Sequence, residues 1–150
     1  MSGWLLDVNA LLGCAWKNHA DHVPLLAWLM RANDWATCPI TETGFMRVSM
    51  TTAYQASFEN ARRSLTTLCA LPGHRFVTDD VDAALLPPFT SYKDATDAHL
   101  VTLARRNGLK LATLDASLIL RPWAVGIARN PLLASASAPT GAQPTDTPRL

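Results

Sequence analysis

The sequence predicts one α/β domain in which helices cover both faces of a central, mostly parallel sheet. Short apolar segments alternate along the chain with longer segments of helical periodicity, which is typical of βαβ units. The 150 residues are enough for one buried core. Of these residues, 49% are hydrophobic and 17% are charged, which indicates a globular chain and excludes a disordered one.

The expected strands are short, apolar and bounded by polar or turn-forming residues. They occupy residues 5–6, 35–38, 74–77 and 109–113, with a weaker fifth at 124–128. The segments between them carry apolar residues three and four positions apart, which predicts helices. We expect these helices at residues 10–16, 21–32, 41–48, 53–71, 81–86 and 94–106.

The end of the chain differs from the rest in composition. From about Pro131 onward it consists mainly of Ala, Ser, Pro and Thr, with few large apolar residues. Such a composition cannot bury enough surface to form a core. We therefore expect a folded domain over residues 1–130 and a flexible C-terminal tail over residues 131–150.

The cysteines and the hydropathy indicate the compartment. Cys14, Cys38 and Cys69 are widely spaced and form no CxxC pattern, which argues against a disulfide framework and against structural zinc. No apolar run has the length of a membrane span, and the N-terminal residues lead directly into the first strand, with no room for a signal peptide. We expect a cytoplasmic protein that does not contact a membrane.

Four carboxylates occupy positions that a parallel sheet would bring to one edge. Asp7 and Asp115 each follow an apolar strand, and Asp97 and Glu42 lie near the starts of two helices. Strand ends and the first turns of the following helices meet at the carboxyl edge of such a sheet, where ligands bind. Each residue alone has a plain alternative, as a helix cap, a partner of the helix dipole or a solvated side chain.

Carboxylates gathered in this way repel one another and need a counter-charge. Oxygen ligands favour Mg²⁺ or Mn²⁺, and such an ion can activate a water for attack on a phosphodiester. We expect Asp7, Asp97 and Asp115 to hold the metal, with Glu42 as a further ligand or as the group that orients the water. The predicted chemistry is metal-assisted phosphodiester hydrolysis.

The net charge of +1 gives no bulk argument for nucleic-acid binding, so any basic surface must be local. Lys17, Arg47 and Lys93 are the basic residues expected near the carboxylate edge, where they could contact phosphates. The alternative is that these three side chains only face solvent.

Four blocks in this order resemble the motifs of PIN-domain ribonucleases, and most closely the VapC toxins of bacterial toxin–antitoxin pairs. The blocks are residues 5–12, 41–48, 96–100 and 111–115, and the resemblance covers roughly residues 3–128. It implies a three-layer α/β/α sandwich and Mg²⁺- or Mn²⁺-dependent cleavage of RNA, often tRNA or ribosomal RNA. It also implies a homodimer and a small antitoxin protein that blocks the site.

The resemblance assigns roles to matching positions. Asp7, Glu42, Asp97 and Asp115 match the acidic set of the family. Thr113 matches its hydroxyl residue beside the last acid, and Asn9 matches its polar residue after the first.

Two positions depart from the family pattern. His99 stands where Tyr is usual, and Ala116 and Ser117 stand where a basic residue and Gly are common. The second difference removes a positive charge near the site, which affects RNA affinity or target choice more than catalysis.

Two other functions fit the same α/β pattern. One is a catalytically silent PIN-like module that holds RNA or an antitoxin, although the intact acidic set argues against it. The other is a receiver-like phospho-acceptor domain, which expects an acidic pair after the first strand and a Lys after a late strand. The sequence has neither feature.

Overall fold

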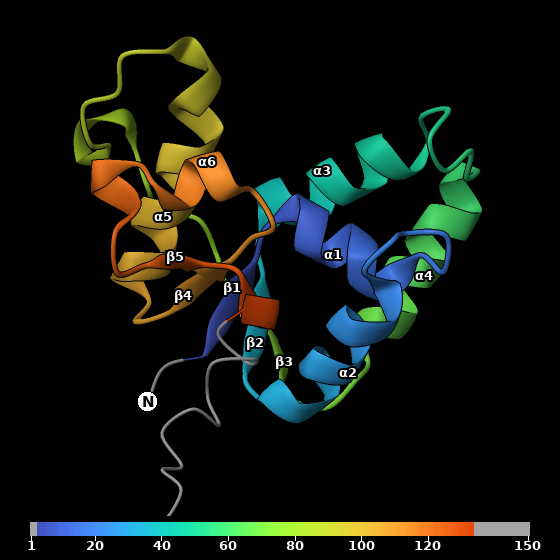
Figure 1. The fold of residues 1–150 in the computed structure, drawn as a ribbon. Helices are drawn as coiled ribbons and strands as arrows, with labels where there is room; N and C mark the ends of the chain where they lie inside the picture. The colour runs from blue at the N-terminus through green and yellow to red at the C-terminus, as the bar shows by residue number, and fades with distance from the viewer. Residues whose placement is uncertain (1–2, 134–150) are drawn as a thin grey trace, which may run out of the picture.

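A five-stranded sheet forms the centre of the molecule in the computed structural model, which describes residues 3–133 (Figure 1). The strand order is β3-β2-β1-β4-β5, and every neighbouring pair is parallel. The expectation of a mostly parallel sheet is confirmed, and among the described strands it is entirely parallel. The strands are β1 (Trp4–Leu6), β2 (Trp35–Thr37), β3 (His74–Phe76), β4 (Lys110–Ala112) and β5 (Ala128–Arg129).

Helices cover both faces, which confirms the three-layer arrangement. Figure 1 shows α1 to α4 on one side of the sheet and α5 with α6 on the other. The helices are α1 (Val8–Ala15), α2 (His22–Ala32), α3 (Pro39–Ser49), α4 (Phe58–Cys69), α5 (Ala95–Arg106) and α6 (Ala116–Ile119). Three short 3₁₀ turns are η1 (Ala83–Leu85), η2 (Tyr92–Asp94) and η3 (Pro122–Ala124).

Side chains that alternate along the strands build one core on each face of the sheet. Leu5 and Leu111, paired across β1 and β4, pack on the α5 side. Leu6 and its partner Ala112 pack against α1 to α4. The three leucines are fully buried, and each contributes about 2 kcal/mol of transfer free energy. The central strands are therefore held from both sides, which fixes the edge where they end.

Helix α4 begins later than the apolar pattern predicted. The expected helix over residues 53–71 starts only at Phe58, because the Ser57 hydroxyl caps it by accepting from the Asn60 backbone N–H at 3.1 Å. Just before the cap, Gln55 takes a left-handed conformation with φ 54°, which a continuous helix does not permit. Residues 51–57 are therefore a turn and not part of the helix.

Two further element boundaries differ from the prediction. Helix α3 starts at Pro39 and not at Thr41, because the Thr41 hydroxyl accepts from the Cys38 backbone N–H (3.0 Å) and caps the start of the helix. This earlier start places Glu42 in the first turn of α3. The expected strand over residues 124–128 is shorter, since η3 occupies its beginning and only Ala128 and Arg129 pair with β4.

Most of the expected C-terminal tail, residues 134–150, lies outside the described residues. Of the remainder, Pro131 is buried and Leu132 packs partly buried against the core beneath α1 and α2. Within residues 3–133, no helix combines the length and apolar character that crossing a membrane requires.

Candidate active site

The central strand β1 delivers Asp7 to the carboxyl edge of the sheet. Its backbone N–H donates to the Ala112 carbonyl of β4 at 2.9 Å, so the end of β1 is fixed to its neighbour. The carboxylate is only 7% exposed and accepts from the Val8 N–H and from the Thr113 hydroxyl, both at 2.8 Å. Burial raises the pKa of Asp7, these two hydrogen bonds lower it, and the charge of Asp115 raises it further.

Thr113 and Asn9 hold two of the acids in place. The fully buried Thr113 hydroxyl donates to Asp7 and accepts from the Asp115 backbone N–H at 3.1 Å. The Asn9 carbonyl oxygen accepts from the Leu114 N–H at 3.1 Å, and its amide donates to the Thr113 hydroxyl at 3.5 Å. Both residues thus join the end of β1 to the end of β4 and orient the carboxylates.

The pKa of Asp97 is strongly perturbed at this edge. The residue lies half-buried in the first turn of α5. Its pKa is raised to about 6, first by burial and then by the charges of Asp7, Asp115 and Asp94, while Arg121 opposes the rise. The three predicted metal ligands are therefore close enough to repel one another.

Asp115 has a different environment, because it also caps α6. Its Oδ1 accepts from the Ser117 hydroxyl at 2.7 Å and from the Ser117 and Leu118 backbone N–H groups at 2.9 and 3.2 Å. The Ser117 hydroxyl is the main cause that lowers the pKa of Asp115. Ser117, a departure from the family pattern, thus keeps this carboxylate ionised, and Oδ2 takes part in none of these bonds.

Arg121 is a cation at this edge that the sequence reasoning missed. Its Nη2 donates to Asp94 Oδ1 at 3.2 Å, and its charge lowers the pKa of both Asp97 and Asp115. The pair joins η2 to the segment after α6, and no local pattern connects two residues 27 positions apart. Asp94 is therefore the acid that Arg121 binds directly.

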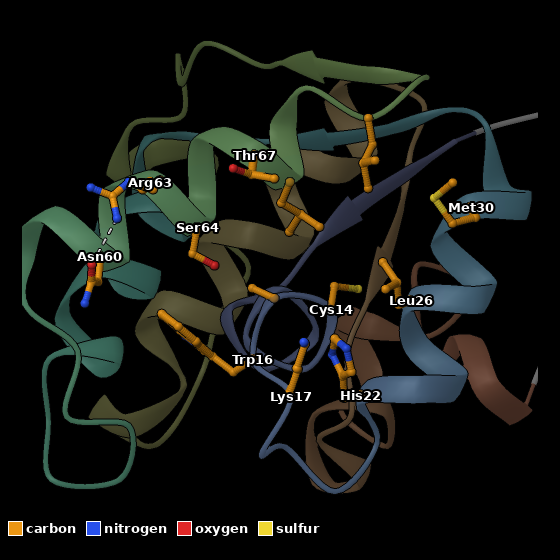
Figure 2. A pocket seen from close by; sticks show the side chains of 13 residues that line it. Cys14, Trp16, Lys17, His22, Leu26, Met30, Asn60, Arg63, Ser64 and Thr67 are labelled. Atoms are coloured by element: carbon orange, nitrogen blue, oxygen red, sulfur yellow. Dashed lines mark hydrogen bonds between the residues drawn. The ribbon is translucent and has the colours of Figure 1, made fainter.

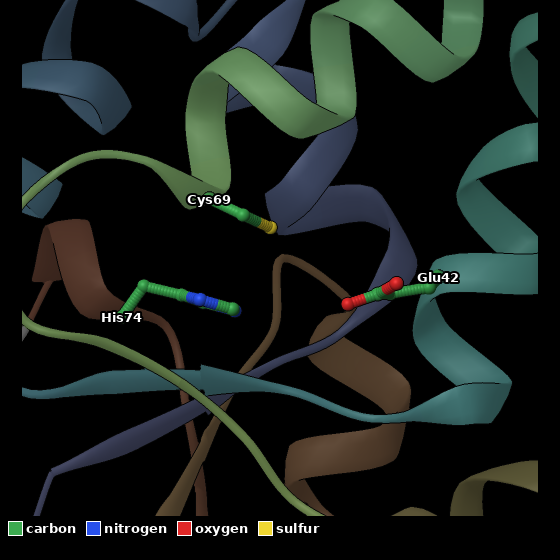
Figure 3. Close-up of side chains that lie close together, drawn as sticks. All are labelled: Glu42, Cys69 and His74. Carbon is green, nitrogen blue, oxygen red and sulfur yellow. The ribbon is translucent and has the colours of Figure 1, made fainter.

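Glu42 does not join the aspartates as expected for a four-acid cluster. Its carboxylate accepts from the Thr37 hydroxyl at 2.5 Å, and it is not among the charges that shift the pKa of Asp7 or Asp97. Its donor atom lies instead with those of Cys69 and His74 (Figure 3). Glu42 still occupies the predicted edge, because α3 starts directly after β2.

The predicted basic residues are distributed around the molecule. Lys93 is exposed in η2, immediately before the helix that carries Asp97. Arg47 is exposed in the last turn of α3, beyond Glu42. Lys17, expected near the same edge, follows the end of α1 and lines a groove elsewhere.

The aspartate set fits Mg²⁺ or Mn²⁺ by its donor chemistry and its charge. All three predicted ligands are carboxylates that repel one another. Arg121 is the one cation among the groups that shift the pKa of Asp97. The oxygens of Asp7, Asp97 and Asp115 do not all lie within 4.8 Å of one another. Mg²⁺ binds oxygen at about 2.1 Å, so an ion held directly by all three carboxylates would require these side chains to move closer, with waters completing its coordination.

An apolar groove lies between the end of α1, α2 and α4 (Figure 2). Its volume is about 570 Å³. Its lining includes Trp16, Lys17, Leu26, Met30, Arg63 and Leu71. Met30 is 56% exposed, so the groove presents apolar surface to solvent with cations beside it.

Neutralising Asp97 tests the electrostatics of the edge. Its pKa is about 6 in the folded protein and 3.8 ordinarily, so the folded state binds more protons between these values and its stability falls as pH rises through them. We expect Asp97→Asn to be more stable than the unmodified chain by about 1 kcal/mol near neutral pH, after allowance for screening of a half-exposed group.

Below the ordinary pKa of 3.8 both states are protonated, so the advantage of Asp97→Asn should disappear as pH falls toward that value. Urea unfolding in the presence of a chelator, followed from neutral pH downward, measures this difference. An advantage that stays constant with pH would contradict the proposed charge repulsion.

Comparisons with known proteins agree with the fold. Residues 4–121 match the family model of the PIN domain. Among curated proteins of Mycobacterium tuberculosis (strain ATCC 25618 / H37Rv), Ribonuclease VapC38 is 48% identical over 120 residues, which covers 75% of this chain and 84% of that protein. Ribonuclease VapC39 is 38% identical over 124 residues, covering 76% and 89%. Ribonuclease VapC29 is 31% identical over 117 residues, covering 76% and 86%.

The family model spans most of the chain, and these relatives align over three quarters of it. The resemblance read from the four sequence blocks is thereby confirmed. The chain belongs to the PIN-domain family and is a homologue of the VapC ribonucleases.

Proposed function

We propose that this protein is the toxin of a toxin–antitoxin pair and acts as a metal-dependent endoribonuclease. One observation carries the proposal: Asp7, Asp97 and Asp115, from three distant segments, share an edge where burial, and then the charges of Asp7 and Asp115, raise the pKa of Asp97 to about 6. The relatives described above are all ribonucleases, which supports RNA as the substrate.

In this proposal Asp7, Asp97 and Asp115 hold Mg²⁺ or Mn²⁺. Such an ion, when bound, lowers the pKa of a water and stabilises charge on the phosphate. Thr113 and Asn9 keep the Asp7 carboxylate oriented through the hydrogen bonds described above.

Glu42 is proposed to orient the attacking water or to take its proton. That role requires the Glu42 side chain to break its hydrogen bond with Thr37. It must then turn toward the edge of the sheet that carries Asp7, Asp97 and Asp115, the aspartate edge. Arg121 limits the repulsion between Asp97 and Asp115 and so keeps both ionised.

RNA binding is proposed to use Lys93 and Arg47 for phosphate contacts. Both are exposed, and Lys93 directly precedes the helix that carries Asp97. Such contacts set affinity and its salt dependence, not sequence choice. The proposed substrate is a structured RNA, of the tRNA or ribosomal class that the family resemblance implies.

The apolar groove is proposed to bind the antitoxin through an amphipathic helix. Apolar surface from α1, α2 and α4 faces solvent there, which is the form of site that accepts a helix. Lys17 and Arg63 on its lining favour a helix with acidic residues beside its apolar face.

The same proposal includes a homodimer and a cytoplasmic location. Tyr92 and Leu120 are 83% and 80% exposed, and such side chains are candidates for a subunit contact that sedimentation of the purified protein would reveal. The three free cysteines agree with a reducing compartment. Residues 1–130 are the proposed nuclease domain, and Pro131 and Leu132 pack onto it.

The direct test is cleavage of total RNA with the purified protein. We expect cleavage at discrete sites with Mg²⁺ or Mn²⁺, and loss of all of these products when a chelator removes the ion. Mapping the 5′ ends of the products identifies the RNA. Products that persist unchanged in chelator would contradict a metal-dependent mechanism.

The alternative is a silent PIN-like module that binds RNA or antitoxin. The observation that favours it is the hydrogen bond between Glu42 and Thr37, which holds one of the four acids away from the others. Calorimetric titration with Mn²⁺ separates the two functions. The nuclease should bind the ion and cut RNA, whereas a module would leave RNA intact at millimolar metal.

A further inference from the structure

One group of side chains combines a carboxylate, a thiol and an imidazole at one point. Glu42, Cys69 and His74 each offer a donor atom, and these atoms all lie within 4.8 Å of one another. Within residues 3–133 no second group of three such residues is so close. Figure 3 shows the three side chains, from α3, from the end of α4 and from the start of β3, pointing into the same space.

We propose that Glu42, Cys69 and His74 form a second metal site, suited to Zn²⁺, and that a bound ion withholds Glu42 from the aspartate edge. The site itself depends only on the placement of these three residues. Its effect on activity rests on the function proposed above for Glu42.

The Thr37 hydroxyl shows that the three donors already converge. It donates to Glu42 Oε2 at 2.5 Å and lies 2.8 Å from His74 Nε2, so it touches two of the three groups. A hydroxyl has one proton, so donation to Glu42 leaves Thr37 to accept from His74. Thr37 is fully buried, and the three ligands are therefore arranged around a fixed polar point.

The spacing is near that of a tetrahedral site. Zinc binds sulfur, nitrogen and oxygen at about 2.0–2.3 Å, which places the donors roughly 3.5 Å apart. The present limit of 4.8 Å is about one ångström wider. Metal binding would therefore require the donors to move closer, and the long, half-buried Glu42 side chain can contribute by rotating. Three protein ligands leave a fourth position for water, as in open zinc sites.

The ligand types distinguish this site from the aspartate edge. Thiolate and imidazole favour Zn²⁺, whereas carboxylates and water favour Mg²⁺ or Mn²⁺. Asp7, Asp97 and Asp115 provide oxygen only, so each site selects a different ion. No sequence pattern indicates the proposed zinc site, because Cys69 belongs to no CxxC pair and His74 begins a strand.

Solvent reaches the group through a cavity of about 400 Å³ whose lining includes Glu42, Cys69 and Arg62. The Arg62 guanidinium is paired with Glu59 at 3.2 Å, which reduces its repulsion of an incoming cation. The cavity therefore supplies the route that an added ion needs.

Glu42 can serve only one of the two sites at a time. It belongs to the helix that follows β2, and β2 is hydrogen-bonded to β1, which delivers Asp7. An ion that fixes Glu42 beside Cys69 and His74 removes it from the attacking water. Loss of a group that positions or deprotonates water slows such reactions by roughly 10²-fold or more.

The test uses Co²⁺ as a spectroscopic probe, because a cobalt–thiolate bond gives a charge-transfer absorption that Mg²⁺ sites lack. We expect this band in the unmodified chain and its loss in Cys69→Ser. Cys14→Ala is the matched control and should retain it, since buried Cys14 belongs to no such ligand group. His74→Ala should weaken Co²⁺ binding at least about tenfold.

A second measurement adds equimolar Zn²⁺ to RNA cleavage in excess Mg²⁺. Cleavage by the unmodified chain should fall at least about tenfold, whereas Cys69→Ser should be unaffected. A missing cobalt band, or one that survives Cys69→Ser, overturns the site. A band without zinc inhibition overturns the withholding of Glu42. If the protein cuts no RNA at all, the proposed function fails and the cobalt titration still decides the site.

Discussion

Asp7→Asn is expected to abolish RNA cleavage while leaving the fold intact. The substitution removes one of three carboxylates proposed to hold the catalytic ion, and stabilisation of the transition state by such an ion is worth several kcal/mol. A loss of about 4 kcal/mol corresponds to a rate lower by roughly 10³-fold. Cleavage of a mapped RNA substrate with Mn²⁺ measures this loss, and growth of cells that express the variant measures loss of toxicity.

The fold should tolerate this change because burial already disfavours the charged form of Asp7 and raises its pKa. An asparagine oxygen can still accept from the Val8 N–H, and its amide can donate to the Thr113 hydroxyl in place of the long 3.5 Å contact from Asn9. Circular dichroism and thermal unfolding should match those of the unmodified chain or show a slightly more stable protein.

The matched control is Asp21→Asn, which removes the same charge at the start of α2, where the side chain makes no capping hydrogen bond. It should cleave RNA at the unmodified rate. If Asp7→Asn retained activity within about tenfold of the unmodified chain, equivalent to less than 1.4 kcal/mol, the aspartates would not hold the catalytic ion.

Met30→Asp is expected to weaken binding of the antitoxin by roughly 30-fold. Met30 contributes apolar surface to the groove between α1, α2 and α4 and is exposed in the free protein. A charge placed under a docked apolar helix must lose its water, and substitutions at such central positions typically cost about 2 kcal/mol. Calorimetry or surface binding with the cognate antitoxin measures the effect.

Val23→Asp supplies the control on the same helix. Val23 is 76% exposed and is not part of the groove lining, so antitoxin affinity should not change. Both variants should retain RNA cleavage, since neither touches the aspartate edge. Equal loss of affinity in the two variants would show that the antitoxin does not use the groove.

The sequence placed three aspartates correctly at one edge because their position follows from topology. In a parallel sheet the ends of β1 and β4 and the first turn of α5 must meet, whatever the side chains around them. Asp7, Asp97 and Asp115 could therefore be grouped without coordinates. Thr113 and Asn9 were assigned only through the family resemblance, and the structure supplies the hydrogen bonds that explain both positions.

The partners of these acids could not be predicted, since they depend on side-chain rotamers and on contacts between distant loops. Glu42 has the expected position, but its carboxylate accepts a hydrogen bond from the Thr37 hydroxyl. Strand periodicity predicts that Thr37 is buried and does not predict which group it contacts. Arg121 reaches Asp94 from a segment with no recognisable motif. The start of α4 was missed for a related reason, because one Ser57 cap outweighed five residues of apolar pattern.

The position of β1 has a consequence during protein synthesis. Strand β1 is made early and pairs with β4, which is made much later. Asp7 and Asp115 therefore cannot come together until most of residues 3–133 have been translated. At 5–20 residues per second, that interval lasts roughly 5–20 s. A nascent chain therefore lacks the complete set of proposed metal ligands until β4 has been made, and so does a truncated product that ends before β4.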